Sequence, residues 1–309
     1  MARNTDLLLT AIAPVVWGST YIVTTEFLPA GYPMTVAMLR ALPAGLLLLL
    51  IVRQLPVGIW WARSFLLGAL NFSIFWAMLF VAAYRLPGGV AATVGAVQPL
   101  IVIFLARSFL GSTIHALSIV AAMMGIVGVA LLVLTPSAVR LDWVGIAAAL
   151  AGAVSMAGGT VLTRLWQPAV SALTFTAWQL TAGGILLLPV AFFLEPPLPA
   201  LSVMNVAGFV YLGLIGAALV YIFWFRGVAR LEPSVVASLA LLSPVVAVIL
   251  GWWFLDQALS VVQVAGMAIV VGSVWLNQHV QNPGRPATRS APLTEASTAL
   301  AQSQISKRS

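Results

Sequence analysis

Long apolar runs separated by short polar breaks recur along the whole chain. Each run is about 20 residues long, which is the length an α-helix needs to cross a bilayer core of about 30 Å. The alternation over about ten residues that a membrane β-barrel would require is not seen. The pattern therefore predicts an all-α membrane protein with ten transmembrane helices. The predicted spans are residues 6–27, 33–52, 64–84, 88–110, 114–134, 142–163, 171–193, 203–225, 233–255 and 260–280.

The composition supports a bilayer location. Hydrophobic residues make up 62% of the 309 positions and charged residues 7%, with a mean hydropathy of +1.09. That leaves too little polar surface to coat a soluble globule. The absence of cysteine excludes disulfides, thiolate metal sites and cysteine nucleophiles. Residues 281–309 are polar and contain proline, so we expect a disordered cytoplasmic tail there.

The basic residues indicate an orientation. If successive loops are placed on alternating sides, starting with the N-terminus inside, eleven Arg and Lys residues fall inside and only Arg85 and Arg140 fall outside. Loops rich in Arg and Lys stay cytoplasmic. We therefore expect a multi-pass protein of the bacterial inner membrane with both termini in the cytoplasm. The net charge of +7 comes from scattered arginines, without the basic cluster that a nucleic-acid site would need.

One stretch of the sequence recurs 145 residues later. RLPGGVAATVGAVQPLIVIF (85–104) and RLEPSVVASLALLSPVVAVI (230–249) share five of twenty positions, and a weaker match at an offset of 139 aligns 35–47 with 174–186. We therefore predict two five-helix repeats, residues 1–136 and 137–280. Because five is odd, the second repeat is inverted in the membrane. Inverted repeats are typical of secondary transporters, which work by alternating access.

Several motifs together resemble one family of transporters. They are WGSTY (17–21), Arg40 in AMLRALPAG, the prolines Pro99 and Pro244, and GWWFLDQALS (251–260). In this order they resemble EamA-type members of the drug/metabolite transporter superfamily over residues 6–280. Within it, the chain is similar to bacterial exporters of aromatic amino acids. One departure is that the acid Asp256, which ends the ninth helix, is matched by Gly111 in the first half.

The two prolines are candidate hinges. Each lies about halfway along its helix, so each removes a backbone donor and frees the carbonyl of Gly95 or Ala240. Their symmetric placement favours a pair of hinges beside the substrate path. The other interpretation is a static kink, which is common in membrane helices.

Arg40 is the one basic residue well inside an apolar run. An arginine at that depth is costly unless it pairs or faces water. It is a candidate for binding the carboxylate of an amino acid. The alternative is a structural role, bonded to backbone carbonyls or to Glu26, and the resemblance favours this alternative.

Aromatic and uncharged polar residues supply the other candidate substrate contacts. Because Trp76 and Tyr221 correspond in the repeat, both are expected near the centre. The alternative roles are packing or lipid contact for the rings, and interhelical hydrogen bonds of about 0.6 kcal/mol for the polar groups. The aromatic candidates are Trp17, Tyr21, Trp76, Phe80, Trp178, Tyr221 and Trp224, and the polar ones are Asn71, Thr93, Gln98, Gln179 and Ser243.

The absent motifs limit the function. HExxH, GxSxG and the phosphate loop GxxxxGK[ST] are missing, so we expect no enzyme activity, no ATP coupling, and no metal or other cofactor. No acidic residue lies deep in a span, which favours facilitated transport without an obligatory ion. The sequence thus predicts a monomeric exporter of aromatic or hydrophobic amino acids. The alternative is a proton-coupled exporter of drugs or metabolites, lipid-linked ones included.

Overall fold

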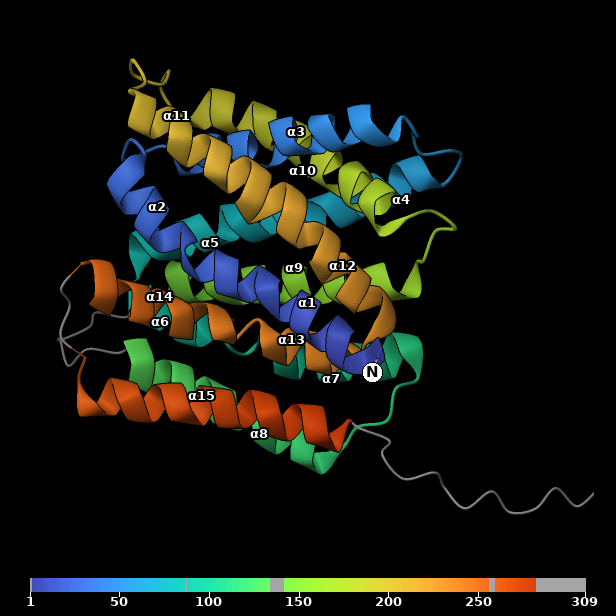
Figure 1. Cartoon of the computed structure of the whole chain (residues 1–309), viewed down its shortest axis with the longest axis vertical. Coiled ribbons are helices and arrows are strands. Elements are labelled where there is room, and N and C mark those ends of the chain that lie inside the picture. Colours follow the sequence, from blue (N-terminus) through green and yellow to red (C-terminus); the bar gives the residue numbers. More distant parts are fainter. Residues whose placement is uncertain (1, 87, 134–141, 256–258, 282–309) are drawn as a thin grey trace, which may run out of the picture.

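The computed structural model is helical throughout the part of the chain that it describes (Figure 1). This part comprises residues 2–86, 88–133, 142–255 and 259–281, without the side chains of residues 2, 21, 83, 84 and 88–90. It contains ten helical segments long and apolar enough to cross a membrane. The predicted all-α fold with ten spans is therefore confirmed. Asp256 and the predicted tail beyond Gln281 lie outside the described residues.

Five of the ten spans are continuous helices and five are interrupted. The continuous spans are α3 (Pro33–Val52), α8 (Ala116–Val133), α9 (Trp143–Leu165), α10 (Ala172–Leu194) and α15 (Val261–Val280). The interrupted first, fourth and ninth spans are α1–α2 (Ala2–Gly18, Thr20–Phe27), α6–α7 (Gly88–Gly95, Gln98–Leu110) and α13–α14 (Pro233–Leu239, Leu242–Phe254). The third and eighth spans each contain a π-helical segment, as α4–η1–α5 (Trp60–Gly68, Ala69–Ser73, Ile74–Arg85) and α11–η2–α12 (Val203–Val210, Tyr211–Leu219, Val220–Arg230).

Three spans extend about one turn further than their apolar runs, and the first of them begins at Ala2 rather than at residue 6. The third span begins at Trp60 rather than at residue 64, and the eighth ends at Arg230 rather than at residue 225. The added turns contain Arg3, Arg63 and Arg226. Long basic side chains can lie along an apolar surface while their charged ends reach polar surroundings. Helix limits that are predicted from hydropathy alone therefore leave out these terminal turns.

The interruptions of the fourth and ninth spans lie just before the two midspan prolines. In the fourth, the Val97 amide donates to the Val94 carbonyl (3.2 Å) in a turn that precedes Pro99. In the ninth, the Leu241 amide donates to the Ser238 carbonyl (3.1 Å) just before Pro244. The breaks that the prolines predict are therefore present. The Ala240 carbonyl, however, is not free as predicted, because it accepts from the Ser243 amide at 3.1 Å. The π-helical segments were not predicted.

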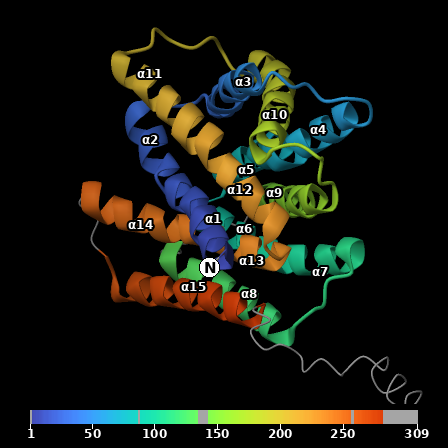
Figure 2. The same ribbon diagram turned by 45° about the vertical axis from the view of Figure 1, so that its right-hand side comes forward.

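The spans form a bundle in which two tightly packed helix pairs flank the interrupted spans (Figures 1 and 2). The helices α3 and α10 pack together on one flank, and α8 and α15 pack together on the other. Between them, α1 packs against α12 and α5 packs against α9. We call the end of the bundle where α1 begins and α15 ends the terminal face, and the other end the distal face.

Both flanking pairs are closed by reciprocal glycine contacts. A Cβ added at Gly45 would collide with Thr181, and one added at Gly184 would lie 2.6 Å from Leu42. The two contacts correspond at the 139-residue offset, because Gly45 aligns with Gly184 and Leu42 aligns with Thr181. In the other pair, a Cβ at Gly128 would lie 2.8 Å from Val270, and one at Gly266 would lie 2.9 Å from the amide nitrogen of Leu132. Small residues let membrane helices approach closely, so these pairs form the tightest packing in the bundle.

We predict that Gly45→Ala and Gly184→Ala each lower the free energy of unfolding by about 1–3 kcal/mol, because the added methyl group overpacks the α3–α10 contact. Thermal unfolding of the purified protein in detergent measures the effect. Gly158→Ala is the matched control, because a Cβ there meets nothing within 4 Å. Equal melting temperatures for all three variants would show that the glycines do not set this contact.

Candidate substrate-binding site

Six aromatic rings from three spans meet in the middle of the bundle. The Trp17 ring lies 4.9 Å from Tyr221 and 5.0 Å from Trp224, measured between ring centroids. The Phe72 ring lies 4.7 Å from Tyr221 and 5.4 Å from Trp76. We call this group the central aromatic cluster; its members are Trp17, Phe72, Trp76, Tyr221, Trp224 and Phe225.

The cluster joins residues that correspond at the 145-residue offset in the sequence. Trp76 on α5 and Tyr221 on α12 correspond at the 145-residue offset, and both contact Phe72. Both are almost fully buried, at 5% and 2% exposure. The rings mostly pack in tilted or edge-to-face arrangements, which stabilise aromatic pairs by about 0.5–1.5 kcal/mol. In this conformation the rings fill the centre by packing on one another.

A polar junction lies beside the aromatic cluster. The carbonyl of Gly216, in the π-helical segment η2, accepts hydrogen bonds from Arg40 Nη2 at 2.8 Å and from Trp17 Nε1 at 3.2 Å. The Arg40 guanidinium also lies over the Trp76 ring, 5.2 Å from its centroid. A π-helix changes the i→i−4 bonding pattern, and such segments often occur at functional sites. We call this arrangement the Gly216 junction.

The geometry of Arg40 bears on its two interpretations. Its bond to a backbone carbonyl supports a structural role, although the partner is Gly216 and not the exposed Glu26. Its Nε atom is buried and has no hydrogen-bond partner among the described residues. The side chain therefore retains one donor that a carboxylate could use.

A second polar group crosses three spans near η1. Asn71 Nδ2 donates to Gln179 Oε1 (2.8 Å) on α10 and to Thr163 Oγ1 (3.2 Å) on α9. Asn71 and Gln179 are both buried, at 1% and 0% exposure. Within the described residues, Asn71 Oδ1 and Gln179 Nε2 have no partner. These side chains tie the helices together and still carry unused polar atoms.

The remaining aromatic candidates lie in different surroundings. Phe80 is half-buried and packs against the core that contains the central aromatic cluster. Trp178 belongs to a second aromatic group with Trp60 and Phe175, and its indole nitrogen donates to the Gln54 carbonyl at 2.7 Å. The side chain of Tyr21 is outside the described part of the structure.

The polar and hinge candidates of the fourth and ninth spans lie near the two breaks. Thr93 and Gln98 are half-buried, and the buried Nε2 of Gln98 has no partner in the described part of the chain. The backbone of Ser243 lies against α1, because a Cβ at Gly18 would lie 2.8 Å from the Ser243 carbonyl oxygen. The hinge candidates are Gly95, Pro99, Ala240 and Pro244; a Cβ at Gly95 would meet nothing within 4 Å.

Two central residues escaped the sequence reasoning. Phe72 lies one helical turn before Trp76, so it extends the aromatic stripe of the third span by one position. Gly216 aligns with Asn71 at the 145-residue offset, and this match to a polar residue in the other half could have drawn attention to it. A backbone carbonyl that accepts from an arginine leaves no periodic pattern in the sequence.

The ten-span bundle, with interrupted helices and buried polar groups at its centre, has the architecture of a multi-pass membrane transporter. The chain belongs to the EamA-like transporter family, whose model matches it twice, over residues 5–134 and 143–277. This result confirms the resemblance to the drug/metabolite transporter superfamily. Members of this family are transporters and not enzymes.

Named relatives and a solved structure agree with this assignment. The chain is 46% identical to Protein PecM of Dickeya dadantii, over 87% of this chain and 90% of that protein. It is 28% identical to the probable terminal-alkyne amino-acid exporter of Streptantibioticus cattleyicolor, over 72% and 75% of the two chains. A crystal structure with 18% sequence identity shares the fold, with a TM-score of 0.78 over 90% of this chain and 98% of the other.

Proposed function

We propose that this transporter exports aromatic or other hydrophobic amino acids by facilitated alternating access. The observation that carries the proposal is the central aromatic cluster, because it places six rings from both halves of the chain next to the Gly216 junction. Aromatic side chains suit contact with an aromatic or aliphatic substrate. The similarity to a protein named as an amino-acid exporter supports the same substrate class.

The binding mode follows from the unused polar atoms. When the spans separate, the rings of Trp76 and Tyr221 line the space between the halves and contact the substrate side chain. The carboxylate of a zwitterion accepts from Arg40 Nε, and its ammonium group donates to Asn71 Oδ1; neither atom has a partner among the described residues. Arg40 then has a structural role at Gly216 and a binding role at Nε. Thr93, Gln98, Gln179 and Ser243 supply further polar contacts along the path.

Alternating access requires two halves that can exchange roles. We infer that residues 1–136 and 137–280 are inverted repeats, with the breaks at Pro99 and Pro244 as hinges. Three observations support this inference: the two matches to the family model, the reciprocal glycine contacts, and the π-helical segments in the third and eighth spans. Bending at one break would open the centre toward one face while the other break keeps the opposite face closed.

The basic residues support a bacterial inner-membrane location with the terminal face in the cytoplasm. Arginines lie at the terminal ends of several spans, among them Arg53, Arg107 and Arg164, whereas Arg85 lies at a distal end. The side of the membrane with more arginine and lysine in its loops is the cytoplasmic side. Each half completes the other across the centre of one chain, so we propose that a monomer suffices for transport.

We predict that the purified protein in sealed liposomes takes up labelled phenylalanine saturably without an ion gradient. Excess unlabelled tryptophan should block this uptake, because it competes for the aromatic cluster, and glycine should not. Empty liposomes are the control. An absence of uptake, with or without an imposed proton gradient, would reject the amino-acid proposal and favour export of drugs or lipid-linked metabolites.

We predict that Gly95→Ala and Pro244→Ala lower the turnover rate by about tenfold and change KM little, because each stiffens a hinge that acts during conformational exchange. A methyl group at Gly95 has free space, so a steric clash would not explain its effect. Initial uptake rates across a range of phenylalanine concentrations separate the two parameters.

The control for the hinge variants is Pro43→Ala, in the continuous helix α3, which should transport at the wild-type rate. Wild-type turnover in both hinge variants would leave the breaks as static kinks.

A further inference from the structure

Two ion pairs lie at opposite faces of the bundle. At the distal face, Arg85 Nη1 lies 3.1 Å from Asp142 Oδ2. At the terminal face, Arg230 Nη1 lies 3.5 Å from Asp6 Oδ1. Both pairs are formed in this structure, so each face carries one closed contact between two spans.

The two pairs join corresponding helices. Arg85 ends α5 in the first half and Arg230 ends α12 in the second, 145 residues later. Asp142 immediately precedes α9, the first span of the second half, and Asp6 lies in α1, the first span of the first half. Each pair therefore ties the third span of one half to the first span of the other half. The same helices pack along their length, α5 on α9 and α1 on α12.

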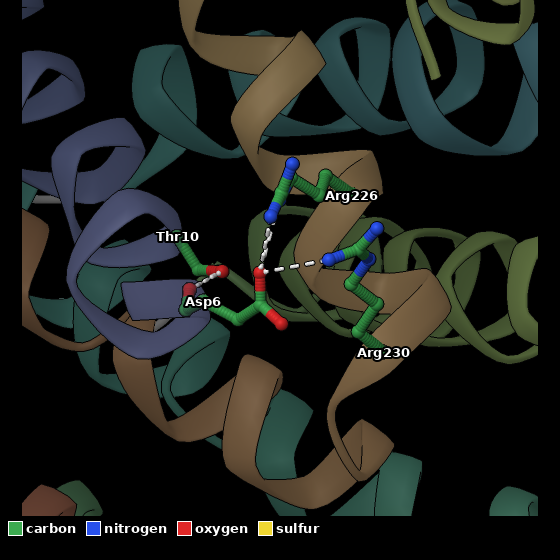
Figure 3. Close-up of polar contacts among 4 residues, drawn as sticks. All are labelled: Asp6, Thr10, Arg226 and Arg230. Atoms are coloured by element: carbon green, nitrogen blue, oxygen red, sulfur yellow. Dashed lines mark hydrogen bonds and ion pairs between the residues drawn. The ribbon is translucent and has the colours of Figure 1, made fainter. Parts of the chain in front are cut away.

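The terminal pair is the stronger of the two. Asp6 Oδ1 also lies 2.9 Å from Arg226 Nη2, so one carboxylate is held by two arginines (Figure 3). The side chain of Asp6 is only 8% exposed, whereas those of Arg85 and Asp142 are 48% and 34% exposed. Exposed pairs are screened by solvent and salt and stabilise little. The distal contact should therefore open more easily.

The distal carboxylate remains charged over a wide pH range. The hydrogen bond from Arg85 and the backbone amides of Val144 and Gly145 hold the pKa of Asp142 below its usual value. These amides belong to the first turn of α9, which Asp142 caps. Protonation would release Arg85 only in strongly acidic solution, so the charge pair persists near neutral pH.

The terminal pair borders a cavity that opens at the terminal face. This cavity has a volume of about 290 Å³, and Asp6 and Arg230 form part of its wall, together with Arg3 and Glu232. It is close in size to the smaller ligand pockets of proteins. A small molecule entering from the terminal face would meet the Asp6 pair before reaching the central aromatic cluster.

We infer that the Arg85–Asp142 and Arg230–Asp6 pairs are the two gates of the transport cycle, which open in turn. This inference rests on the proposed alternating access. Breaking the terminal pair lets α12 separate from α1 and admits substrate from the cavity, while the distal pair holds α5 against α9. The reverse step opens the distal face. With both pairs formed, the structure is a state closed at both ends.

The chain contains no cysteine, so pairs of introduced cysteines can report each gate directly. The distal reporter is Arg85→Cys with Asp142→Cys, and its rate of cross-linking by a short bifunctional maleimide is measured in lipid nanodiscs without substrate. Adding Asp6→Asn should raise that rate by about fivefold or more, because weakening the terminal gate favours distal closure. If Asp6→Asn fails to fold, the same pair can be weakened by the double variant Arg226→Gln with Arg230→Gln. This double variant should also raise the rate of distal cross-linking.

The reciprocal arm uses Asp6→Cys with Arg230→Cys as the terminal reporter. Here Asp142→Asn, which keeps the helix cap but removes the charge, should speed terminal cross-linking. The matched control for the distal reporter is Arg107→Gln, which removes an exposed terminal-face arginine outside both pairs and should leave the rate unchanged.

The gate assignment would be overturned if the cross-linking rates of both the distal and the terminal reporter were unchanged by substitutions in the opposite ion pair. The result is separable from the substrate proposal, because the reporters require no substrate. If each reporter responds to the opposite pair but phenylalanine is not taken up, the gate assignment stands and the substrate proposal is rejected. If phenylalanine is taken up but each cross-linking rate is independent of the opposite pair, the substrate proposal stands and the gate assignment is rejected.

Discussion

The structure depends on one constraint: backbone groups freed inside a bilayer must find partners within the protein. This chain interrupts five of its ten spans and then binds carbonyls of the irregular segments with side chains from other spans. The Gly216 carbonyl in η2 accepts from Arg40 and Trp17. The Leu70 carbonyl in η1 accepts from Ser155 at 2.8 Å. The bonds at Gly216 also position Trp17 and, through Arg40, the ring of Trp76, so the irregular backbone and the central aromatic cluster are parts of one arrangement.

Four of the five continuous spans lie at the flanks of the bundle, and the interrupted spans lie between them together with the continuous helix α9. The flanking helices α3, α10, α8 and α15 are continuous and lock together through glycines whose contacts leave no room for a methyl group. The spans between them carry the proline breaks, the π-helical segments and both ion pairs. Interdigitated backbones resist movement more than helices with broken hydrogen-bonding patterns do. In the proposed cycle, the flanks therefore serve as scaffolds, and bending is concentrated in the interrupted spans.

The sequence predicted the number of spans, nearly all of their limits and the two proline breaks, because hydropathy and proline act locally. It also indicated Trp76 and Tyr221 through the repeat, and both lie in the central aromatic cluster. It did not predict the π-helical segments, since residues 69–73 and 211–219 contain no proline or other local signal for an extra residue per turn. It also gave no reason to pair Asp6 with Arg230. Their pairing depends on how α1 packs against α12, which no local pattern specifies.

The central claim is that substrate contacts the central aromatic cluster and not the aromatic group around Trp60. The most direct test is the affinity for phenylalanine, measured by titration calorimetry, of Trp76→Leu, Tyr221→Leu and Trp60→Leu. The account predicts that the first two variants bind about tenfold more weakly, as expected for the loss of an aromatic contact, and that Trp60→Leu binds like the wild type. Unchanged affinity in Trp76→Leu and Tyr221→Leu, or an equal loss in Trp60→Leu, would contradict it.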